Sequence, residues 1–329
     1  MIETAVIEGG AMGAEEAAYN ASLFGTELSH EAFVVDSASK IASAAQSAAD
    51  APCIVLHLPE ASMVDRALEA TEASGAILLN AGSLDDALRQ DNCHPRLFHV
   101  AASHAQHVDA LVLWLRERES SSITVLTGER GDAPSAYAAS QLEKAGFEVR
   151  AVVESPAEAG DGAVWVTPTA QPGAFSQLGP ERLVLAPHVV PEAAEVAHGP
   201  VLWHESLFKY GATQVSDRFS KRARQPMDGI AYANWLGMQI AADAMAQTGS
   251  TDPEALRQHL RTVTRFDGRK AAPISFRSWN QQARHELYIR TPDPEAPIAS
   301  SIPERMPDAP DAQIQALDAL GVRRDACSL

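Results

Sequence analysis

The sequence lacks any long apolar segment. None of its hydrophobic runs approaches the ~20 residues that cross a bilayer as a helix, and its amino terminus has no basic stretch followed by a hydrophobic one. We expect a soluble protein whose first residues resemble a mature secreted chain, with a start methionine in place of a signal peptide. Hydrophobic residues form 46% of the 329 positions, enough for two cores of ordinary size.

Basic residues are also scarce. The chain has 26 Lys and Arg residues against 43 Asp and Glu residues, a formal net charge of −17. Phosphate binding depends on a basic surface that releases counterions, so this charge argues against nucleic acid as a partner.

Familiar catalytic and cofactor-binding motifs are missing. Residues 8–13 (EGGAMG) approach a phosphate-binding loop, but they have neither the GxGxxG spacing nor a Lys-Ser/Thr ending, and they also suit a simple glycine turn. Neither a GxSxG nucleophile elbow nor an HExxH pair occurs. His104 and His107 share one predicted helix turn, with no third metal ligand in view. We expect neither an enzyme nor a bound cofactor.

The 3 cysteines have no metal-ligand spacing and form no CxxC. Cys53 opens an apolar strand, where a thiol behaves as a small buried hydrophobe. Cys93 lies in a polar loop and Cys327 in an irregular tail, and unpaired thiols in such places are a liability outside the cytoplasm. These positions predict a Cys93–Cys327 disulfide; the alternative is a cytosolic protein with reduced thiols.

Strand-type and helix-type segments alternate along the chain. Continuous apolar strands between amphipathic helices predict an α/β fold with parallel sheets covered on both faces. The alternation restarts after Ala101, which indicates a second unit. The longest helical pattern runs from Asp228, its cap, to Thr248, and Gly249 ends it. The predicted strands are residues 4–7, 32–35, 53–58, 76–79, 97–100, 122–126, 148–153, 162–166, 182–186 and 201–203.

Small polar residues and glycine gather at predicted strand ends. Open α/β sheets bind ligands just beyond the carboxyl ends of their strands. Such residues are equally ordinary turn and cap formers, so a structural role stays open for each. Trp203 ends a later strand and is the candidate of the second unit. The candidate ligand-binding residues of the first unit are Glu8, His57, Asn80, Ser83, Ala102 and Ser103.

Several segments together resemble a known family. The helical stretch 228–262 and the turn-and-strand at 266–276 resemble the type I periplasmic binding proteins of the branched-chain amino acid class. Further segments resemble the subgroup of these substrate-binding proteins that is associated with PQQ-dependent alcohol oxidation. They are residues 80–89 (NAGSLDDALR) with Cys93, 97–103 (LFHVAAS), 209–214 (KYGATQ) with Arg218-Phe219, and 274–279 (ISFRSW).

The resemblance implies two doubly wound parallel-sheet lobes joined by a three-stranded hinge. It places residues 1–101 and 214–286 in lobe 1, and residues 102–213 and 287–329 in lobe 2. It further implies a monomeric periplasmic protein that captures a small solute between closing lobes and delivers it to an ABC permease.

Two other functions fit the same fold. PQQ-linked alcohol oxidation uses calcium or lanthanide ions, and Asp85 and Asp86 beside Glu8 would supply hard oxygen ligands to a metal or metal complex. The same two carboxylates also suit a helix start that the helix dipole stabilises. A ligand sensor that docks on a membrane receptor would share the sequence as well.

Overall fold

The computed structural model describes residues 2–23, 25–35, 37–48, 50–118, 122–178, 182–187, 196–262, 265–303, 326, 327 and 329. The chain forms two compact units. Unit 1 comprises Met1–Ser103, Leu207–His285 and Arg323–Leu329, and unit 2 comprises His104–Ser206 and Glu286–Val322. The chain thus changes unit after residues 103, 206, 285 and 322, where the sequence predicted changes after 101, 213 and 286.

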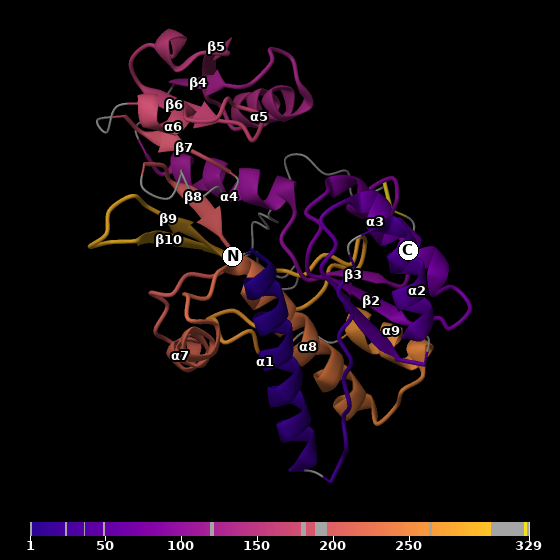
Figure 1. The fold of residues 1–329 in the computed structure, drawn as a ribbon. Helices are drawn as coiled ribbons and strands as arrows, with labels where there is room; N and C mark the ends of the chain where they lie inside the picture. Colours follow the sequence, from indigo (N-terminus) through magenta and orange to yellow (C-terminus); the bar gives the residue numbers. More distant parts are fainter. Residues whose placement is uncertain are drawn as a thin grey trace. The chain divides into compact units, whose positions relative to one another are not determined.

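Unit 1 contains a three-stranded parallel sheet in the order β1-β2-β3 (Figure 1). β1 (Cys53–Leu56) pairs with β2 (Ile77–Asn80), and β2 pairs with β3 (Leu97–His99). All residues of β2 and β3 are buried, as expected for strands with helices on both faces. The predicted strands in these three places are confirmed.

Helices cover both faces of this sheet. Successive side chains of a strand point to opposite faces, and Ile54 and Leu56 of β1 join the core formed with α2 (Ala38–Ser47) and α3 (Ala61–Ala70). Val55 faces the other way, where α8 (Gly229–Thr248) passes so close that a Cβ added to Gly237 would lie 2.9 Å from the Val55 side chain.

α8 begins and ends where the sequence predicts. The carboxylate of Asp228 accepts a hydrogen bond from the Ala231 amide at 2.8 Å, and Gly249 ends the helix in the left-handed conformation. α9 (Pro253–Thr262) follows, and both helices contact β2.

The amino-terminal segment differs from the prediction. Residues 4–7 are not a strand but part of α1 (Ile2–Ser22), a helix that packs along α8 (Figure 1). The two backbones nearly touch, because a Cβ added to Gly9 would lie 2.4 Å from the Ala231 carbonyl oxygen and one added to Gly13 would lie 2.7 Å from that of Trp235. The glycines therefore serve helix packing rather than a turn at a sheet edge.

The strand predicted over residues 32–35 is also wrong. Residues 26–35 form no helix or strand, and Phe33 and Val34 are exposed. An apolar run becomes a strand only where a neighbouring backbone accepts its hydrogen bonds.

α7 (Ala212–Ala223) lies against α1 in the same unit.

Unit 2 contains a parallel sheet in the order β5-β4-β6-β7. The predicted strands are confirmed within a few residues. Alternate residues of β6 and β7 form its core with Phe175 of α6 (Ala174–Gln177). The strands are β4 (Ser122–Leu126), β5 (Glu148–Val153), β6 (Ala163–Val166) and β7 (Val184–Leu185).

A small antiparallel sheet, in the order β10-β9-β8, completes unit 2. β8 (Gly199–Val201) and β10 (Ile298–Pro303) flank β9 (Glu286–Arg290), and α4 (His104–Arg116) contacts all three strands. β10 corrects the sequence analysis, which gave residues after 292 no strand. The remaining helices are α5 (Ala133–Lys144) and the short turns η1 (Asp86–Arg89) and η2 (Pro156–Glu158).

The carboxyl-terminal tail is tied to unit 1. A disulfide joins Cys93 to Cys327, which confirms the predicted pairing. Cys53 is free, and burial raises its pKa to about 12, so its thiol stays protonated. The sequence also predicts a short helix in this tail, near residues 312–320, which lies outside the described residues. Within those residues, no helix is long and apolar enough to cross a membrane.

Candidate functional site

The loop after β2 forms one part of the carboxyl edge of the unit 1 sheet. Asn80 ends β2 and organises this loop, since its side-chain oxygen accepts hydrogen bonds from the amides of Gly82 at 3.1 Å and Ser83 at 2.8 Å. Its side-chain nitrogen donates to the Ser83 carbonyl at 2.8 Å. Asn80 and Ser83 are both fully buried. The Asn80 amide therefore shapes the loop, a structural role that the sequence analysis left open.

Arg89 fastens this loop to the one after β3. Its guanidinium is fully buried and donates hydrogen bonds to the carbonyl oxygens of Ser83 and Ala101, each at 3.1 Å. It also donates to the Asp85 carbonyl at 2.7 Å and to the Gln282 side-chain oxygen at 2.5 Å. Gln282 in turn donates to the Ala101 carbonyl at 3.0 Å. The backbone of the two loops is thus held in one arrangement.

Sequence reasoning missed the roles of Arg89 and Gln282. Arg89 stands at the end of the one-turn helix η1, in a pattern typical of a surface turn, and Gln282 lies 193 positions later. Nothing local to either residue predicts that they meet.

His57 follows β1 at the same edge of the sheet. A Cβ added to Gly82 would lie 2.6 Å from the Leu58 amide nitrogen, so the loops after β1 and β2 touch. Burial lowers the pKa of His57, against the opposing effect of its hydrogen bond with Ala81. The imidazole is therefore neutral at neutral pH, and its Nδ1 lies 3.1 Å from the Asn234 side-chain nitrogen, from which it accepts a hydrogen bond.

The other predicted residues belong to different elements and units. Ala102 and Ser103 follow β3 and are buried in unit 1, whereas Trp203 follows β8 and is buried in unit 2. Glu8 lies within α1 rather than at a strand end, and its carboxylate pairs with Arg222 of α7. The strand that motivated the choice of Glu8 does not exist.

Asp85 and Asp86 begin η1. The Asp85 carboxylate accepts a hydrogen bond from the Ala87 amide at 2.9 Å and so caps η1, at the helix start that the sequence analysis weighed against metal binding. Over the described part of the chain, no group of three or more His, Cys, Asp or Glu side chains is arranged to hold a metal ion.

A cluster of hydroxyl groups occupies the carboxyl edge of the unit 2 sheet. Thr127 follows β4, and Thr167 and Thr169 follow β6. The three hydroxyl oxygens lie 3.0 to 3.1 Å from one another. A Cβ added to Gly128 would lie 2.1 Å from the Thr169 carbonyl oxygen, so the two loops are in contact. The threonines at strand ends were a signal that the sequence analysis overlooked.

Asp132 anchors this threonine cluster and caps α5. Its carboxylate accepts hydrogen bonds from Thr127 at 2.7 Å, from Thr169, and from the Ser135 amide at 2.8 Å. Burial opposes ionisation of Asp132, but the hydrogen bonds from Thr169, Ser135 and Thr127 outweigh it and lower the pKa to about 2. The cluster is therefore a set of hydroxyls held by a carboxylate that is ionised at neutral pH.

Comparisons with known proteins agree with this architecture. A family model described as "Periplasmic binding protein" matches residues 182–296. No curated protein matches the sequence. Among solved structures, an ABC transporter substrate-binding protein from Desulfitobacterium hafniense in complex with Leu is 16% identical, with a TM-score of 0.71 over 90% of this chain and 95% of that one.

Two further solved structures have the same fold. A branched-chain amino acid transporter substrate-binding protein from Streptococcus pneumoniae, in complex with isoleucine, is 12% identical with a TM-score of 0.69 and covers 92% of this chain and 94% of that one. A solute-binding protein from R. palustris, in complex with benzoate, is 11% identical with a TM-score of 0.65 and covers 92% of this chain and 91% of that one. The fold of this chain is therefore that of type I periplasmic binding proteins.

Proposed function

We propose that this chain is the periplasmic substrate-binding component of an ABC transporter and that it binds a small solute rather than catalysing a reaction. The observation that carries the proposal is the pair of organised sheet edges, one in each unit. In unit 1, Arg89 and Gln282 fix the loops after β2 and β3. In unit 2, Asp132 fixes the threonines after β4 and β6. Such edges are where open α/β sheets bind ligands.

The solute class follows from the groups at these edges. Hydroxyls and backbone groups of tight loops are hydrogen-bond partners for a small polar molecule. Four of the similar solved structures hold Leu, isoleucine, benzoate and 3,4-dihydroxybenzoic acid, all of which carry a carboxyl group. We infer a small carboxylic acid, either an amino acid or an aromatic acid, with closure of the two units on the ligand as the binding step.

The sequence motifs refine the proposal. Residues 80–89 and 97–103 resemble the subgroup associated with PQQ-dependent alcohol oxidation, and these segments are the loops that Arg89 joins. We therefore propose that the solute belongs to alcohol metabolism of that kind, for example an acid that alcohol oxidation yields.

A thermal-shift series on the purified chain tests the function. The probes are leucine, isoleucine, benzoate and 3,4-dihydroxybenzoate, with calcium and lanthanide salts as the competing metal hypothesis. A ligand that binds only the folded state raises the melting temperature as its concentration rises. Such a rise with at least one of the four acids supports the proposal. A rise with metal salts alone would contradict it.

A matched pair of variants then locates the site. Thr169→Val removes the exposed hydroxyl of the threonine cluster, and Thr262→Val removes an exposed hydroxyl of α9 that only bonds its own helix. We expect Thr169→Val to weaken binding about two- to tenfold, the value of one hydrogen bond, and Thr262→Val to leave it unchanged. Equal affinity in both variants would remove the threonine cluster from the site.

A further inference from the structure

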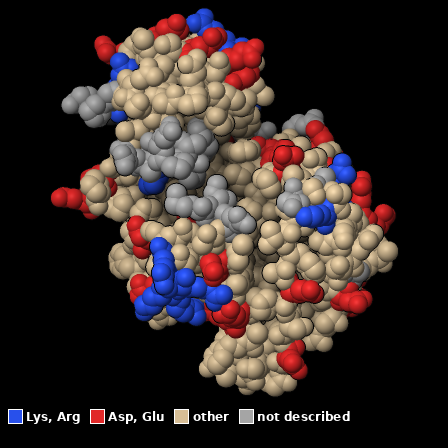
Figure 2. Space-filling view, in the orientation of Figure 1, with Lys and Arg blue, Asp and Glu red and all other residues tan. Residues whose placement is uncertain are grey.

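A cationic surface stands out on this acidic chain. Of the 26 Lys and Arg residues, four fall within or just beyond α7, at Arg218, Lys221, Arg222 and Arg224. Figure 2 shows a blue patch of Lys and Arg side chains over α7, with tan and red surface around it. Cations in the last turn complement the helix dipole, but that effect is satisfied by one or two of them.

Part of this positive charge is used within unit 1. Arg218 pairs with Glu16 of α1 at 2.8 Å, and Arg222 pairs with Glu15 at 2.6 Å and with Glu8. The hydrogen bond from Arg222 lowers the pKa of Glu15. These ion pairs link α7 to α1, so they hold the cationic helix in place against α1.

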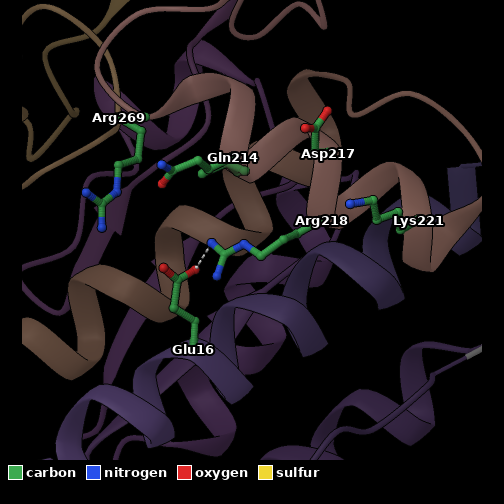
Figure 3. A pocket seen from close by; sticks show the side chains of 8 residues that line it. Glu16, Gln214, Asp217, Arg218, Lys221 and Arg269 are labelled. Atoms are coloured by element: carbon green, nitrogen blue, oxygen red, sulfur yellow. Dashed lines mark hydrogen bonds and ion pairs between the residues drawn. The ribbon is translucent and has the colours of Figure 1, made fainter.

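A surface pocket of about 390 Å³ adjoins these pairs. Its lining includes the acidic Glu16 and Asp217 as well as three cations, and Arg269 pairs with Asp267 at 2.9 Å. Lys221, Gln214 and Arg269 contribute to its wall next to Arg218. Figure 3 shows the Gln214 amide between Arg269 and Arg218, and the Glu16 carboxylate bonded to Arg218. Throughout the described residues, neither the Lys221 ammonium nor the Gln214 amide has a hydrogen-bond or ion-pair partner. The pocket thus presents free donors to an anion.

Two exposed aromatic side chains precede the pocket. Phe208 is 73% exposed and Tyr210 is 62% exposed, although the chain has few aromatics to leave in water. Tyr210 has a φ of 57°, an uncommon conformation for a residue with a side chain, and the next residue, Gly211, lines the pocket. The Lys209 ammonium lies 5.6 Å from the centre of the Phe208 ring. Exposed aromatic side chains close to cations are typical of protein interaction sites.

We propose that the pocket and the adjacent aromatic residues Phe208 and Tyr210 form a docking site for an acidic segment of a partner protein. A free carboxylate ion would be held by a few exposed cations that water screens. A peptide segment with several carboxylates reaches Lys221 together with Arg218 and Arg269, each of which also keeps one carboxylate partner within the chain, and its apolar residues cover the aromatics. The docking site lies wholly in unit 1 and does not depend on the proposed solute-binding function.

Fluorescence anisotropy with a defined probe tests the docking site on the full chain. The probe is a short fluorescein-labelled peptide of alternating Glu and Leu, and the same peptide with Gln for Glu is the neutral control. We expect the acidic peptide alone to bind, and its affinity to fall as salt rises from about 20 to 150 mM. Free glutarate, a small dicarboxylate, should show no comparable binding.

Variants assign the binding to this pocket. Lys221→Gln and Arg269→Gln should each raise the dissociation constant about threefold, and Phe208→Ser about fivefold. Arg66→Gln, which removes an exposed cation of α3, is the matched control and should change nothing. These side chains are partly or fully exposed, so melting temperatures should stay near that of the parent. The proposal is overturned if the acidic peptide does not bind, if glutarate binds as tightly, or if Arg66→Gln weakens binding as much as Lys221→Gln.

Discussion

Arg89 is the residue on which the order of the unit 1 sheet edge depends. Arg89→Met keeps the length of the side chain and removes the guanidinium. The buried carbonyl oxygens of Ser83 and Ala101 then lose a donor, as does the part-buried carbonyl oxygen of Asp85. We expect a large loss of stability and a loosening of the loops that the guanidinium joins.

The magnitude follows from the bonds that Arg89 makes. Hydrogen bonds to a charged group contribute about 1.5–3 kcal/mol each, and Arg89 donates four. Burying the guanidinium costs several kcal/mol, which the variant recovers. The difference lowers the free energy of unfolding by about 3–5 kcal/mol, the usual cost of removing one partner from a buried charged network.

Arg96 provides the matched control within the same unit. It stands just before β3, at the opposite edge of the sheet, and donates to the carbonyl oxygens of Leu68, Thr71 and Ala76 at 2.9 to 3.2 Å. Since Arg96 is only part-buried, water replaces some of these bonds in Arg96→Met. We expect that variant to lose about 1–2 kcal/mol.

Urea unfolding measures the stabilities, and hydrogen exchange followed by mass spectrometry locates the change. Arg89→Met should speed exchange at residues 81–85 and 100–103, whereas Arg96→Met should speed it near residues 68–76. A loss below about 1 kcal/mol in Arg89→Met, or unchanged exchange at its two loops, would show that the guanidinium does not hold the edge together.

Three other perturbations test the structure. Cys93→Ser removes the disulfide to Cys327, which joins residues 234 positions apart in the sequence. We expect the free energy of unfolding to fall by up to about 5 kcal/mol, measured by thermal melts with and without reductant. Gly128→Ala should lower the free energy of unfolding by about 1–3 kcal/mol, because the added Cβ would lie 2.1 Å from the Thr169 carbonyl oxygen. Gly10→Ala, which adds a Cβ into open space, should not destabilise α1. Similar melting temperatures for both variants would contradict the close contact between Gly128 and Thr169. Hydrogen bonds hold the pKa of Asp132 at about 2, below its ordinary value of 3.8, so its contribution to stability is complete above pH 4 to 5 and disappears as the pH falls through 2. Asp132→Asn should therefore flatten that part of the pH–stability curve.

Helices and strands that are specified by residues close together in the sequence could be predicted. The strands of both parallel sheets follow continuous apolar runs, and α8 begins at Asp228 and ends at Gly249 through contacts within a few residues. The pairing of Cys93 with Cys327 followed from the settings of the cysteines. The positions of His57, Asn80 and Ser83 after strands followed from the strands themselves.

The amino-terminal helix was not predictable in this way. Residues 4–7 have the composition of a short strand, and Gly9 and Gly13 suggest a turn. Both glycines are needed because the backbone of α8 approaches within less than a side chain's width. That approach belongs to a helix more than 200 positions away in the sequence, so no pattern near residue 9 reveals it.

By itself, the sequence determined the alternating elements, their caps and the strand ends at which a ligand site is expected, because hydrogen bonds and apolar periodicity act over a few residues. Only the tertiary structure decided what those strand-end residues do. The Asn80 side chain hydrogen-bonds within its own loop, and the buried Arg89 donates to a glutamine 193 positions away. The Asp132 carboxylate accepts hydrogen bonds from threonines that follow two different strands. A side chain's role depends on which backbone atoms surround it, and the fold brings those atoms together from distant parts of the chain.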